Sequence, residues 1–372
     1  MTSKPHIAIV GGGPGGLMLA RLLQLRGFES TVFERDRHAG DRPQGGSLDL
    51  HGDTGQRAMR VAGLENEFIA AARPEDQGDR LYDQNGTLLF DRDGAGDDRP
   101  EIDRTALRQI LLDSLAPGIV RWESKVEAVT PRPDGGYDVL AGGTAERFDI
   151  VVGADGAWSR VRPLLAETTP QYEDVTLVEF GFDARRHTNV DVLVGGGKMF
   201  AVGDNRVLIA QRNGHGHIRA YAGLRLPERI AQKWTTQAPD RVRATLLHTF
   251  AGWAPALTYL IERGDFIAVR PLYALPIGYT WQSKLGITLL GDAAHLMSPF
   301  GGEGVNLALA DAVDLAEALT AGESWQAVVA CQAAIMKRAR AAAEAAAEGL
   351  NGSISSDGVA HVLNHYRERV ET

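Results

Sequence analysis

The first apolar segments of the chain predict a parallel sheet. His6-Ile-Ala-Ile-Val10 is a short apolar run that ends in glycines, and Leu17 to Leu25 then repeats leucine at helical spacing up to Gly27. A second apolar run, Ser30 to Glu34, follows at once. Strand, helix and strand within about 30 residues is the size of one parallel crossover unit, so we expect the chain to open on a parallel sheet.

The middle of the chain has a different pattern. Between Gln171 and Asp265, short segments of alternating apolar and polar residues are separated by Gly, Asn and Asp, which is typical of half-buried strands. This region therefore predicts an antiparallel second lobe. Its expected strands are Val175 to Phe182, Asp191 to Val194, Arg206 to Gln211 and His217 to Leu224, and Gly195-Gly-Gly-Lys198 is expected to be a hairpin turn.

The last third of the chain returns to the first pattern. Ile287 to Leu290 is again an apolar strand followed by glycine, so the first lobe is expected to be discontinuous in sequence. Residues beyond Ser324 are rich in Ala, Glu and Arg, and they predict C-terminal helices with a break around Asn351 to Gly358. The expected fold class is α/β, with a Rossmann-like lobe, an antiparallel-sheet lobe and C-terminal helices.

Composition narrows the classes of function. The 372 residues are 44% hydrophobic, which allows a substantial core in two lobes, and the net charge of −9 argues against binding to a nucleic-acid backbone. The single cysteine, Cys331, excludes an internal disulfide and the disulfide reductases that depend on one. No run of about 18 apolar residues is present, so we expect no membrane span, no export and a cytoplasmic location.

A glycine-rich motif follows the first predicted strand. Gly11-Gly-Gly13-Pro-Gly15-Gly16 matches G-x-G-x-x-G, and Glu34 ends the next strand 18 residues beyond Gly16. Glycines there let the backbone approach a pyrophosphate, the helix N-terminus stabilises its charge, and a carboxylate accepts ribose hydroxyls. The motif favours FAD or NAD without separating them, and the alternative is a glycine-rich turn with an incidental acid.

Two further segments follow predicted strands in the same way. Phe148 to Gly153 leads into Ala-Asp155-Gly156, which a plain strand-to-turn junction would also explain. Gly291-Asp292 begins the third segment, which continues into a glycine-rich loop, Pro299 to Asn306, at the start of a predicted helix. The carboxylate at the strand end is followed by a second helix N-terminus, which is a second anion-stabilising device that one nucleotide would not need.

The order of these three segments resembles the family of FAD-dependent class A monooxygenases, relatives of para-hydroxybenzoate hydroxylase. Within that family the chain is most similar to the tetracycline-inactivating flavin monooxygenases, and the resemblance covers essentially the whole chain. Gly291-Asp292-Ala-Ala-His295-Leu-Met-Ser-Pro299 is highly specific to the family. The other matching motifs are Val32-Phe-Glu34-Arg35-Asp, Gly45-Gly-Ser-Leu-Asp49-Leu-His51, Glu101-Ile-Asp-Arg104-Thr-Ala-Leu107-Arg and Gly153-Ala-Asp155-Gly156.

The resemblance implies where FAD binds. The glycine loop would line the pyrophosphate, Glu34 would take the adenosine ribose, and Arg35 would pack near the adenine end. Arg104 and Asp292 would contact the ribityl and pyrophosphate part of FAD. The implied cofactor-binding residues are Gly11, Gly13, Gly15, Gly16, Glu34, Arg35, Asp49, Arg104, Asp155, Gly291, Asp292, Pro299, Gly302, Gly304, Val305 and Asn306.

The flavin end of this implied site contains one departure from the family. Asp49 would lie in the flavin region, and the amides of the loop Pro299 to Asn306 would stabilise the anionic reduced ring. Glu303 stands in that loop where the family commonly has a neutral residue, often Gln. An ionised carboxylate there would oppose the charge of the ring, so Glu303 either points away or is compensated.

The resemblance also implies the chemistry. NAD(P)H would reduce FAD, and O2 would form a flavin C4a-hydroperoxide. A dry pocket would bring this hydroperoxide to an aromatic or polycyclic small molecule, with tetracycline-like compounds among the candidates. The flavin does this chemistry, so we expect no catalytic side chain and no metal. No second G-x-G-x-x-G is present, so NAD(P)H would visit transiently. The alternatives are a hydride-transferring FAD oxidoreductase on the same scaffold and a flavin-binding sensor without turnover.

The second lobe carries the candidate substrate residues. Glu179, Lys198, Arg219 and Tyr221 align with positions where tetracycline enzymes contact the drug, but they do not match the tetracycline set. Arg219 and Tyr221 alternate along one predicted strand and therefore share a face, which is either a pocket wall or a solvated surface. The predicted substrate residues are Glu179, Gln211, Arg212, Arg219, Tyr221, Phe300 and Gly301.

The expected domain boundaries follow from these assignments. The FAD-binding domain is expected to hold residues 1–72, 97–170 and 266–320, and the substrate-binding domain residues 73–96 and 171–265. The C-terminal helices, residues 321–372, are expected to bridge the lobes, and the protein is expected to be a monomer. His295 is interpreted as structural, and the hairpin histidines His215 and His217 lack the further ligands that a metal site needs.

Overall fold

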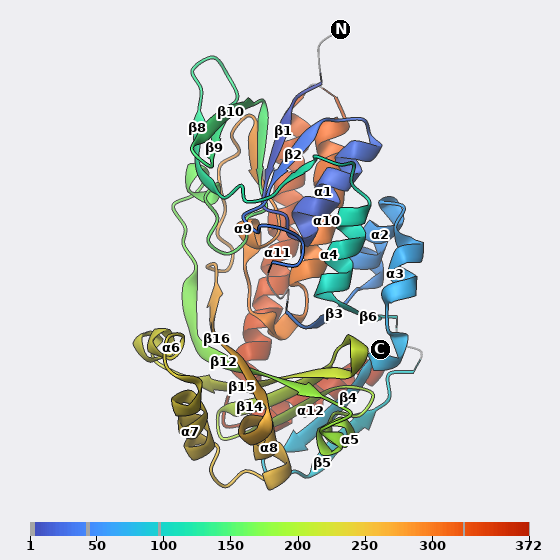
Figure 1. Ribbon diagram of the computed structural model, residues 1–372, viewed down its shortest axis with the longest axis vertical. Coiled ribbons are helices and arrows are strands. Elements are labelled where there is room, and N and C mark those ends of the chain that lie inside the picture. Colours follow the sequence, from blue (N-terminus) through green and yellow to red (C-terminus); the bar gives the residue numbers. More distant parts are fainter. Residues whose placement is uncertain (1–3, 42–44, 96–97, 323, 372) are drawn as a thin grey trace. The chain divides into compact units, whose positions relative to one another are not determined.

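The structure is a computed structural model that describes residues 4–41, 45–95, 98–322 and 324–371. The chain divides into two compact units. Unit 1 holds residues 1–71, 104–171 and 274–345, and unit 2 holds residues 72–103, 172–273 and 346–372. Unit 1 is built on a parallel sheet and unit 2 on a mainly antiparallel sheet, and helices end the chain (Figure 1). The expected α/β fold class is therefore confirmed.

A five-stranded parallel sheet organises unit 1. In spatial order its strands are β17 (Ile287–Leu289), β11 (Ile150–Gly153), β1 (Ile7–Val10), β2 (Ser30–Phe33) and β7 (Val120–Arg121). Every neighbouring pair is parallel, so the carboxyl ends of all five strands lie at one edge. Ligands of open α/β sheets bind outside that edge, and the candidate site lies there.

Helices α1 (Pro14–Leu25) and α10 (Gly304–Thr320) pack against each other in unit 1 (Figure 1). Gly15 permits the close approach, because a Cβ there would lie 2.7 Å from Cδ1 of Leu290 and 3.1 Å from the carbonyl oxygen of Ala308. The other elements of unit 1 are β3 (Ser47–Asp49), η1 (Gly52–Gln56), α2 (Arg57–Val61), α3 (Glu65–Ala71), α4 (Arg104–Asp113), β8 (Val126–Pro131), β9 (Tyr137–Ala141), β10 (Thr144–Phe148), η3 (Arg162–Leu164), α9 (Asp292–His295), η5 (Pro299–Gly301) and most of α11 (Gln326–Ser353).

A seven-stranded sheet organises unit 2. In spatial order its strands are β16 (Asp265–Ala274), β12 (Gln171–Asp183), β15 (His217–Arg225), β14 (Arg206–Arg212), β13 (Gly197–Gly203), β4 (Gly78–Asp83) and β5 (Leu88–Arg92). The other elements are η2 (Pro74–Asp76), β6 (Glu101–Asp103), α5 (Thr188–Val194), η4 (Gly214–Gly216), α6 (Glu228–Trp234), α7 (Pro239–Thr249), α8 (Pro255–Arg263) and α12 (Gly358–Glu371).

The two faces of this sheet have different neighbours. One face forms the core of unit 2, in which Val178 and Phe180 of β12 pack with Trp234 of α6 and Phe250. On the other face, Tyr366 of α12 contacts the rings of residues in β5 and β13. The part of that face formed by β12, β15 and β14 carries polar side chains, which are described below with the candidate site.

One predicted strand in unit 2 was wrong. Asp191 to Val194 form the end of helix α5, although three of the seven residues of that helix are valines. Val190 and Val194 lie one helical turn apart and are both buried in the core, so tertiary packing outweighs β-propensity here. Gly195 to Lys198 is therefore not a hairpin turn, because Gly195 ends the helix with a φ of +71° and leads into β13.

Other elements were not predicted at all. Helices α6, α7 and α8 lie within the region that was expected to contain strands. Pro239 and Pro255 occupy the first turns of α7 and α8, a signal of helix N-termini that the alternation of short segments had obscured. The three-stranded sheet β10-β9-β8 in unit 1 was also absent from the prediction.

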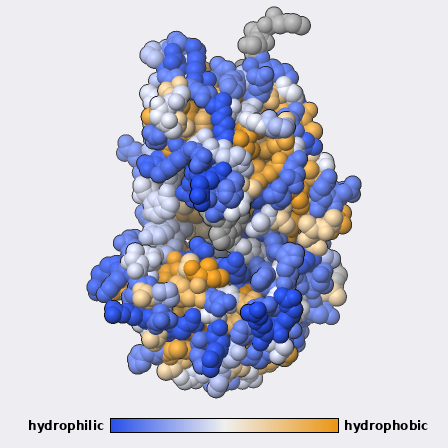
Figure 2. Space-filling model, viewed as in Figure 1, coloured by the Kyte–Doolittle hydropathy of each residue, from blue (hydrophilic) through white to orange (hydrophobic). Residues whose placement is uncertain are grey.

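Figure 2 shows one side of the molecule, on which hydrophilic residues predominate and hydrophobic residues gather in patches. The most exposed large hydrophobic residues, Leu285, Val192, Ile69 and Trp158, belong to four different segments. None of the described helices is both long and apolar enough for a bilayer crossing.

Candidate functional site

The glycine loop after β1 forms a cradle at the N-terminus of α1. Gly11 has a φ of +111°, and a Cβ there would overlap the carbonyl oxygen of Ala154, so only glycine fits. A Cβ at Gly13, by contrast, would meet nothing within 4 Å. No side chain caps α1, so the N–H groups of Gly15 and Gly16 lack intrahelical partners. The cradle therefore offers open space and N–H donors, which suit an anion.

The three glycine-containing segments meet at this cradle. Ala154 donates its N–H to the carbonyl oxygen of Val10 at 2.8 Å, and Leu290 donates its N–H to that of Gly153 at 2.9 Å. Gly291 follows with a φ of +58° and lies against α10. Residues almost 300 positions apart are thus brought to one sheet edge, where the sequence had only placed each after its own strand.

Glu34 is a buried carboxylate beside the cradle. Its Oε2 accepts the N–H of Gly12 at 2.8 Å, and its Oε1 accepts the N–H of Asp36 at 2.9 Å. A carboxylate has about four acceptor positions, so Glu34 retains capacity for ribose hydroxyls. Arg108 of α4 offsets part of the negative charge, with Nη2 3.6 Å from Glu34 and 3.1 Å from Asp36. Arg35 is exposed next to this buried cluster.

Asp155 presents an unsatisfied oxygen at the same edge. Its Oδ2 accepts the N–H of Arg160 at 2.6 Å, whereas its buried Oδ1 has no hydrogen-bond partner among the residues that the structure describes. Burial raises the pKa of Asp155, and hydrogen bonds from Ser159 and Arg160 offset part of that rise. Buried polar atoms are nearly always paired, so this oxygen indicates a ligand or a water at the cradle.

A second helix N-terminus lies at the start of α10. Gly302 adopts the left-handed conformation, and no side chain caps the helix that begins at Gly304. The exposed carboxylate of Asp292 stands beside it, since a Cβ on Gly304 would lie 4.0 Å from Oδ1 of Asp292. Arg104, the first residue of α4, and Pro299 are also exposed, while Val305 is half-buried in the first turn of α10.

Asn306 fastens this loop to the segment after β3. Its buried side chain donates from Nδ2 to the carbonyl oxygen of Asp49 at 3.0 Å and accepts the N–H of His51 at Oδ1 at 2.9 Å. The side chain of Asn306 is therefore engaged within the protein. Its predicted contact with a cofactor would have to come from the backbone.

The negative charge of Glu303 is compensated by His51. Its Oε1 lies 3.4 Å from Nδ1 of His51, whose Nε2 lies 3.3 Å from Oδ2 of Asp49. Burial of the ring lowers the pKa of His51, but hydrogen bonds and charges from Asp49 and Glu303 outweigh burial and raise the pKa to about 9. Of the two arrangements expected for Glu303, pointing away or compensation, the structure contains the second.

His295 belongs to a structural cluster. Its Nε2 lies 2.5 Å from Oδ2 of Asp311, which also accepts the N–H of Gly291, while Arg338 contacts the other oxygen of Asp311 at 2.7 Å. Burial lowers the pKa of His295, but the carboxylate of Asp311 outweighs it and raises the pKa. These contacts tie α9, α10 and α11 together, in keeping with the structural role expected for His295.

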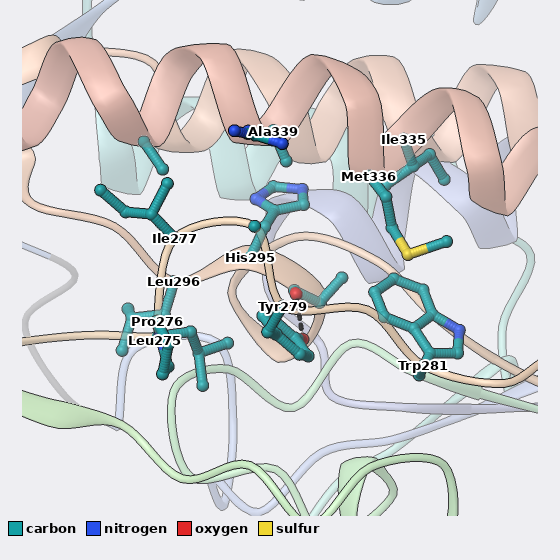
Figure 3. A pocket seen from close by; sticks show the side chains of 14 residues that line it. Leu275, Pro276, Ile277, Tyr279, Trp281, His295, Leu296, Ile335, Met336 and Ala339 are labelled. Carbon is teal, nitrogen blue, oxygen red and sulfur yellow. Dashed lines mark hydrogen bonds between the residues drawn. The ribbon is translucent and has the colours of Figure 1, made fainter.

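The same histidine lines a small cavity in unit 1. In Figure 3 its imidazole points toward α11, near Ala339, and Tyr279 hydrogen-bonds to the carbonyl oxygen of Ala294. Nδ1 of His295 is buried without a partner among the described residues. The cavity is lined by Leu275, Pro276, Ile277, Gly278, Tyr279, Trp281, Ala294, His295, Leu296, Ile335, Met336, Ala339, Arg340 and Ala343. Most of these side chains are apolar, so the cavity offers little polar recognition.

Unit 2 carries a buried carboxylate that meets two arginines. Glu179 on β12 is 0% exposed, and its Oε1 accepts from Arg219 of β15 at 2.6 Å. Its Oε2 accepts from Arg270 of β16 at 2.6 Å. The arginine side chains remain 21% and 52% exposed. One negative and two positive charges leave this cluster with a net charge of about +1 on this part of the sheet face.

The register separates the predicted substrate residues of unit 2 into two groups. Tyr221 pairs with Glu179, and Gln211 pairs with Arg219, so these four side chains share one face. Arg212 projects from the opposite face, where it binds Asp191 and the carbonyl oxygen of Gly195. The structure therefore does not bring Arg212 together with the others. Phe300 and Gly301 lie in η5 of unit 1 and are half-buried.

Three polar residues of these clusters, His51, Arg108 and Arg270, were missed in the sequence. Asp49 and His51 are two positions apart after a strand, and this spacing was a usable signal that they share a face. Arg108 lies one helical turn after Arg104, but its pairing with Glu34 depends on the tertiary fold. Arg270 gave no signal, since nothing local in β16 distinguishes it.

Comparison with known proteins identifies the family. The family model described as FAD binding domain matches residues 4–349. The chain is 35% identical over 370 residues to monooxygenase asqM of Emericella nidulans, with 84% of this chain and 83% of that protein covered. It is 32% identical over 338 residues to 3-amino-4-hydroxybenzoate 2-monooxygenase PtmB3 of Streptomyces platensis, with 86% and 81% covered.

Solved structures share the fold. Klebsiella pneumoniae HpxO, complexed with FAD and uric acid, matches with a TM-score of 0.81 at 20% identity, covering 99% of this chain and 93% of that one. The tetracycline destructase Tet(51) matches with a TM-score of 0.75 at 19% identity, covering 100% and 95%. At such identities the likeness shows the fold alone. The tetracycline enzymes are therefore structural neighbours of this chain.

The geometry at the sheet edge fits the cofactor of this family. The glycine cradle, the unpartnered oxygen of Asp155 and two uncapped helix N-termini suit a dinucleotide with an anionic pyrophosphate. The matched family model covers almost the whole chain. The chain therefore belongs to the FAD binding domain family, and its relatives place it among the FAD-dependent monooxygenases.

Proposed function

We propose that this protein is a monooxygenase that uses FAD, NAD(P)H and O2 to hydroxylate an aromatic or polycyclic small molecule. The observation that carries the proposal is the meeting of three segments at one sheet edge, with the N-termini of α1 and α10 both uncapped. A single nucleotide needs one such terminus, whereas FAD has a pyrophosphate and a flavin ring that becomes anionic on reduction.

The residues at the edge would divide the work along FAD. Gly11 to Gly16 would hold the pyrophosphate on backbone N–H groups, and Glu34 would accept ribose hydroxyls with its remaining acceptor positions. Arg104 and Asp292, both exposed, would reach the middle of the cofactor. The first turn of α10, with Gly304 and Val305, would direct N–H groups toward the flavin.

The bound flavin would supply reduction by NAD(P)H and activation of O2, and the protein would position the substrate and exclude water. No second dinucleotide motif is present in the sequence, so NAD(P)H is proposed to visit the same site transiently. Asp155 belongs to a motif that the family resemblance links to FAD and nicotinamide handling. Its unpartnered oxygen makes it the first residue to test for that role.

The substrate is proposed to be anionic or to carry an ionisable oxygen. Arg219 and Arg270 share one buried carboxylate, so positive charge remains for a phenolate, enolate or carboxylate. The name of PtmB3, a 3-amino-4-hydroxybenzoate monooxygenase, is consistent with an aromatic acid as one candidate class. Tetracyclines, which also carry enolates, belong in the same screen.

The cofactor part of the proposal is tested by two glycine variants. Gly11→Ala should abolish FAD binding, because its Cβ would overlap the backbone of residue 154. Gly13→Ala should leave the apoprotein folded, because its Cβ meets open space, yet weaken FAD binding if the pyrophosphate fills that space. Flavin absorbance after reconstitution and circular dichroism measure the two effects. Equal FAD binding by wild type and both variants would contradict the cofactor site.

The reaction is tested with phenolic, carboxylic and polycyclic compounds. A true substrate should stimulate NAD(P)H oxidation and O2 consumption, and its product should gain one oxygen in mass. Reduction of the substrate without O2 consumption would instead support the hydride-transferring alternative. Slow flavin reduction with every compound would support the sensor.

A substrate-site variant separates recognition from cofactor binding. Arg219→Ala should weaken substrate binding while FAD content stays intact, because Arg219 lies in unit 2 and the proposed cofactor residues lie in unit 1. Arg212→Ala is a matched control from the opposite face of the same sheet. Unchanged substrate-stimulated NAD(P)H oxidation in Arg219→Ala would remove that residue from the proposed site.

A further inference from the structure

Two carboxylates of unit 1 share a single histidine. The ring of His51 lies between Asp49, 3.3 Å from its Nε2, and Glu303, 3.4 Å from its Nδ1. The side chain of His51 is 12% exposed. Its backbone N–H is bound by Asn306, so the ring is fixed to the same loop that carries Glu303. The three charged groups therefore form one cluster at the start of α10.

Only the imidazolium satisfies both carboxylates. A neutral imidazole has one N–H and one lone pair, so one carboxylate would face a lone pair and be repelled. The charged ring donates from both nitrogens, and each carboxylate then receives one hydrogen bond. The geometry by itself selects the protonated ring of His51.

The charge balance at the start of α10 depends on this proton. With His51 charged, the three groups sum to one negative charge. Without that proton the three groups sum to two negative charges. These charges lie at a helix N-terminus, whose partial positive charge is only about half a unit. A flavin ring that becomes anionic on reduction would then meet additional negative charge from Glu303, the residue that departs from the family pattern.

We propose that His51 is a positioning residue of the flavin end: as an imidazolium held between Asp49 and Glu303, it neutralises Glu303 and so favours binding of reduced FAD over oxidised FAD. The inference rests on the proposed function, because it requires FAD to lie against the loop Pro299 to Asn306. It concerns binding of the two redox forms, so it is separable from turnover.

The test compares midpoint potentials of the FAD-loaded wild type with His51→Gln, Glu303→Gln and the double variant. His51→Gln should weaken binding of reduced relative to oxidised FAD about tenfold, which for a two-electron couple lowers the potential by about 30 mV. Glu303→Gln should shift the potential upward by a similar amount. The double variant has the wild-type charge sum and should return close to the wild-type value.

A matched control removes a charge from the same helix at a distance. Glu317 is exposed on α10, 14 residues beyond Glu303 and therefore about 20 Å along the helix. Glu317→Gln should not shift the potential at 0.15 M salt, because the screening length is about 8 Å. A shift as large as that of Glu303→Gln would overturn the proposal by showing a general effect of net charge.

A second measurement uses the apoprotein and survives a failure of any variant to fold. NMR of the histidine side chains should find His51 doubly protonated at pH 7.5 in the wild-type apoprotein. In Glu303→Gln, His51 should lose its proton at a lower pH than it does in the wild type. A neutral His51 at pH 7.5 overturns the inference, as do FAD-loaded single variants with unshifted potentials or with shifts in the same direction. A wild-type chain that binds no FAD overturns the proposed function first, and the inference with it.

Discussion

In both units a carboxylate is buried against two cations, Asp311 in unit 1 and Glu179 in unit 2, but these two clusters end differently. In unit 1, Asp311 lies 2.5 Å from His295 and 2.7 Å from Arg338, and it is 1% exposed. In unit 2, Glu179 meets Arg219 and Arg270 at 2.6 Å each, and it is 0% exposed. The same local chemistry therefore occurs on a helix of one unit and on a strand of the other.

The difference lies in what the cations contact next. Arg338 continues to a second carboxylate, Asp314, at 2.8 Å, so the guanidinium charge in unit 1 is shared by two carboxylates and balanced within the protein. In the described part of unit 2, neither Arg219 nor Arg270 has a second carboxylate partner. Closed clusters hold elements together, whereas an open one leaves charge for a ligand.

We expect the largest loss of stability when the closed cluster around Asp311 is broken. Asp311→Asn should lower the free energy of unfolding by about 3–5 kcal/mol, because it leaves His295 and Arg338 without their buried counter-charge. Urea denaturation at neutral pH measures the loss. Asp314→Asn is the matched control on the same helix, and it should cost about 1 kcal/mol or less because that pair is partly solvated. Equal losses in both variants would contradict the distinction.

The open cluster should be less costly to break. Glu179→Gln should lower the free energy of unfolding by about 2 kcal/mol, the usual range for a hydrogen bond to a charged group, since both arginines can turn to water. Asp183→Asn on the same strand removes an ion pair with a mostly exposed arginine and should cost about 1 kcal/mol or less. If Glu179→Gln proves as damaging as Asp311→Asn, the two clusters are equivalent in stability.

Ligand preference should follow the open cluster. Arg270→Ala should weaken binding of benzoate relative to benzamide about tenfold, because loss of one charge-assisted hydrogen bond corresponds to about 1.4 kcal/mol. Calorimetry with the FAD-loaded protein gives the ratio of dissociation constants. Arg212→Ala, on the opposite sheet face, should leave that ratio unchanged. A ratio that changes only in Arg212→Ala would place the anion site on the other face.

The smallest effect is expected where one cation lies between two carboxylates, the inverse arrangement found at His51. Asp49 and Glu303 outweigh the effect of burial and raise the pKa of His51 to about 9. The contribution of His51 to folding stability is therefore fully present below pH 6.5 and is lost as pH rises through about 9. After allowance for solvent screening the loss is on the order of 1 kcal/mol. Urea denaturation of apoprotein at pH 6.5 and 9.5 measures it, and His51→Asn should show no such component. An identical pH dependence in both proteins would contradict this expectation.

Much of unit 1 could be predicted because its signals are local. Gly11 to Gly16, Glu34 and Asp292 each follow an apolar strand directly, and parallel strands bring their carboxyl ends to one edge. Unit 2 was harder, because the helix ending at Val194 has the composition of a strand and is helical only through burial of Val190 and Val194.

The sequence by itself determined the dinucleotide cradle and the family resemblance, because the spacing of glycines and strand-end acids is encoded within short segments. Only the tertiary structure decided which residue compensates Glu303, since its partner His51 lies about 250 residues earlier. The same holds for Arg270, whose contact with Glu179 joins strands β16 and β12. Whether a buried charge is compensated depends on distances of a few ångströms between remote segments, and these are fixed only when the chain has folded.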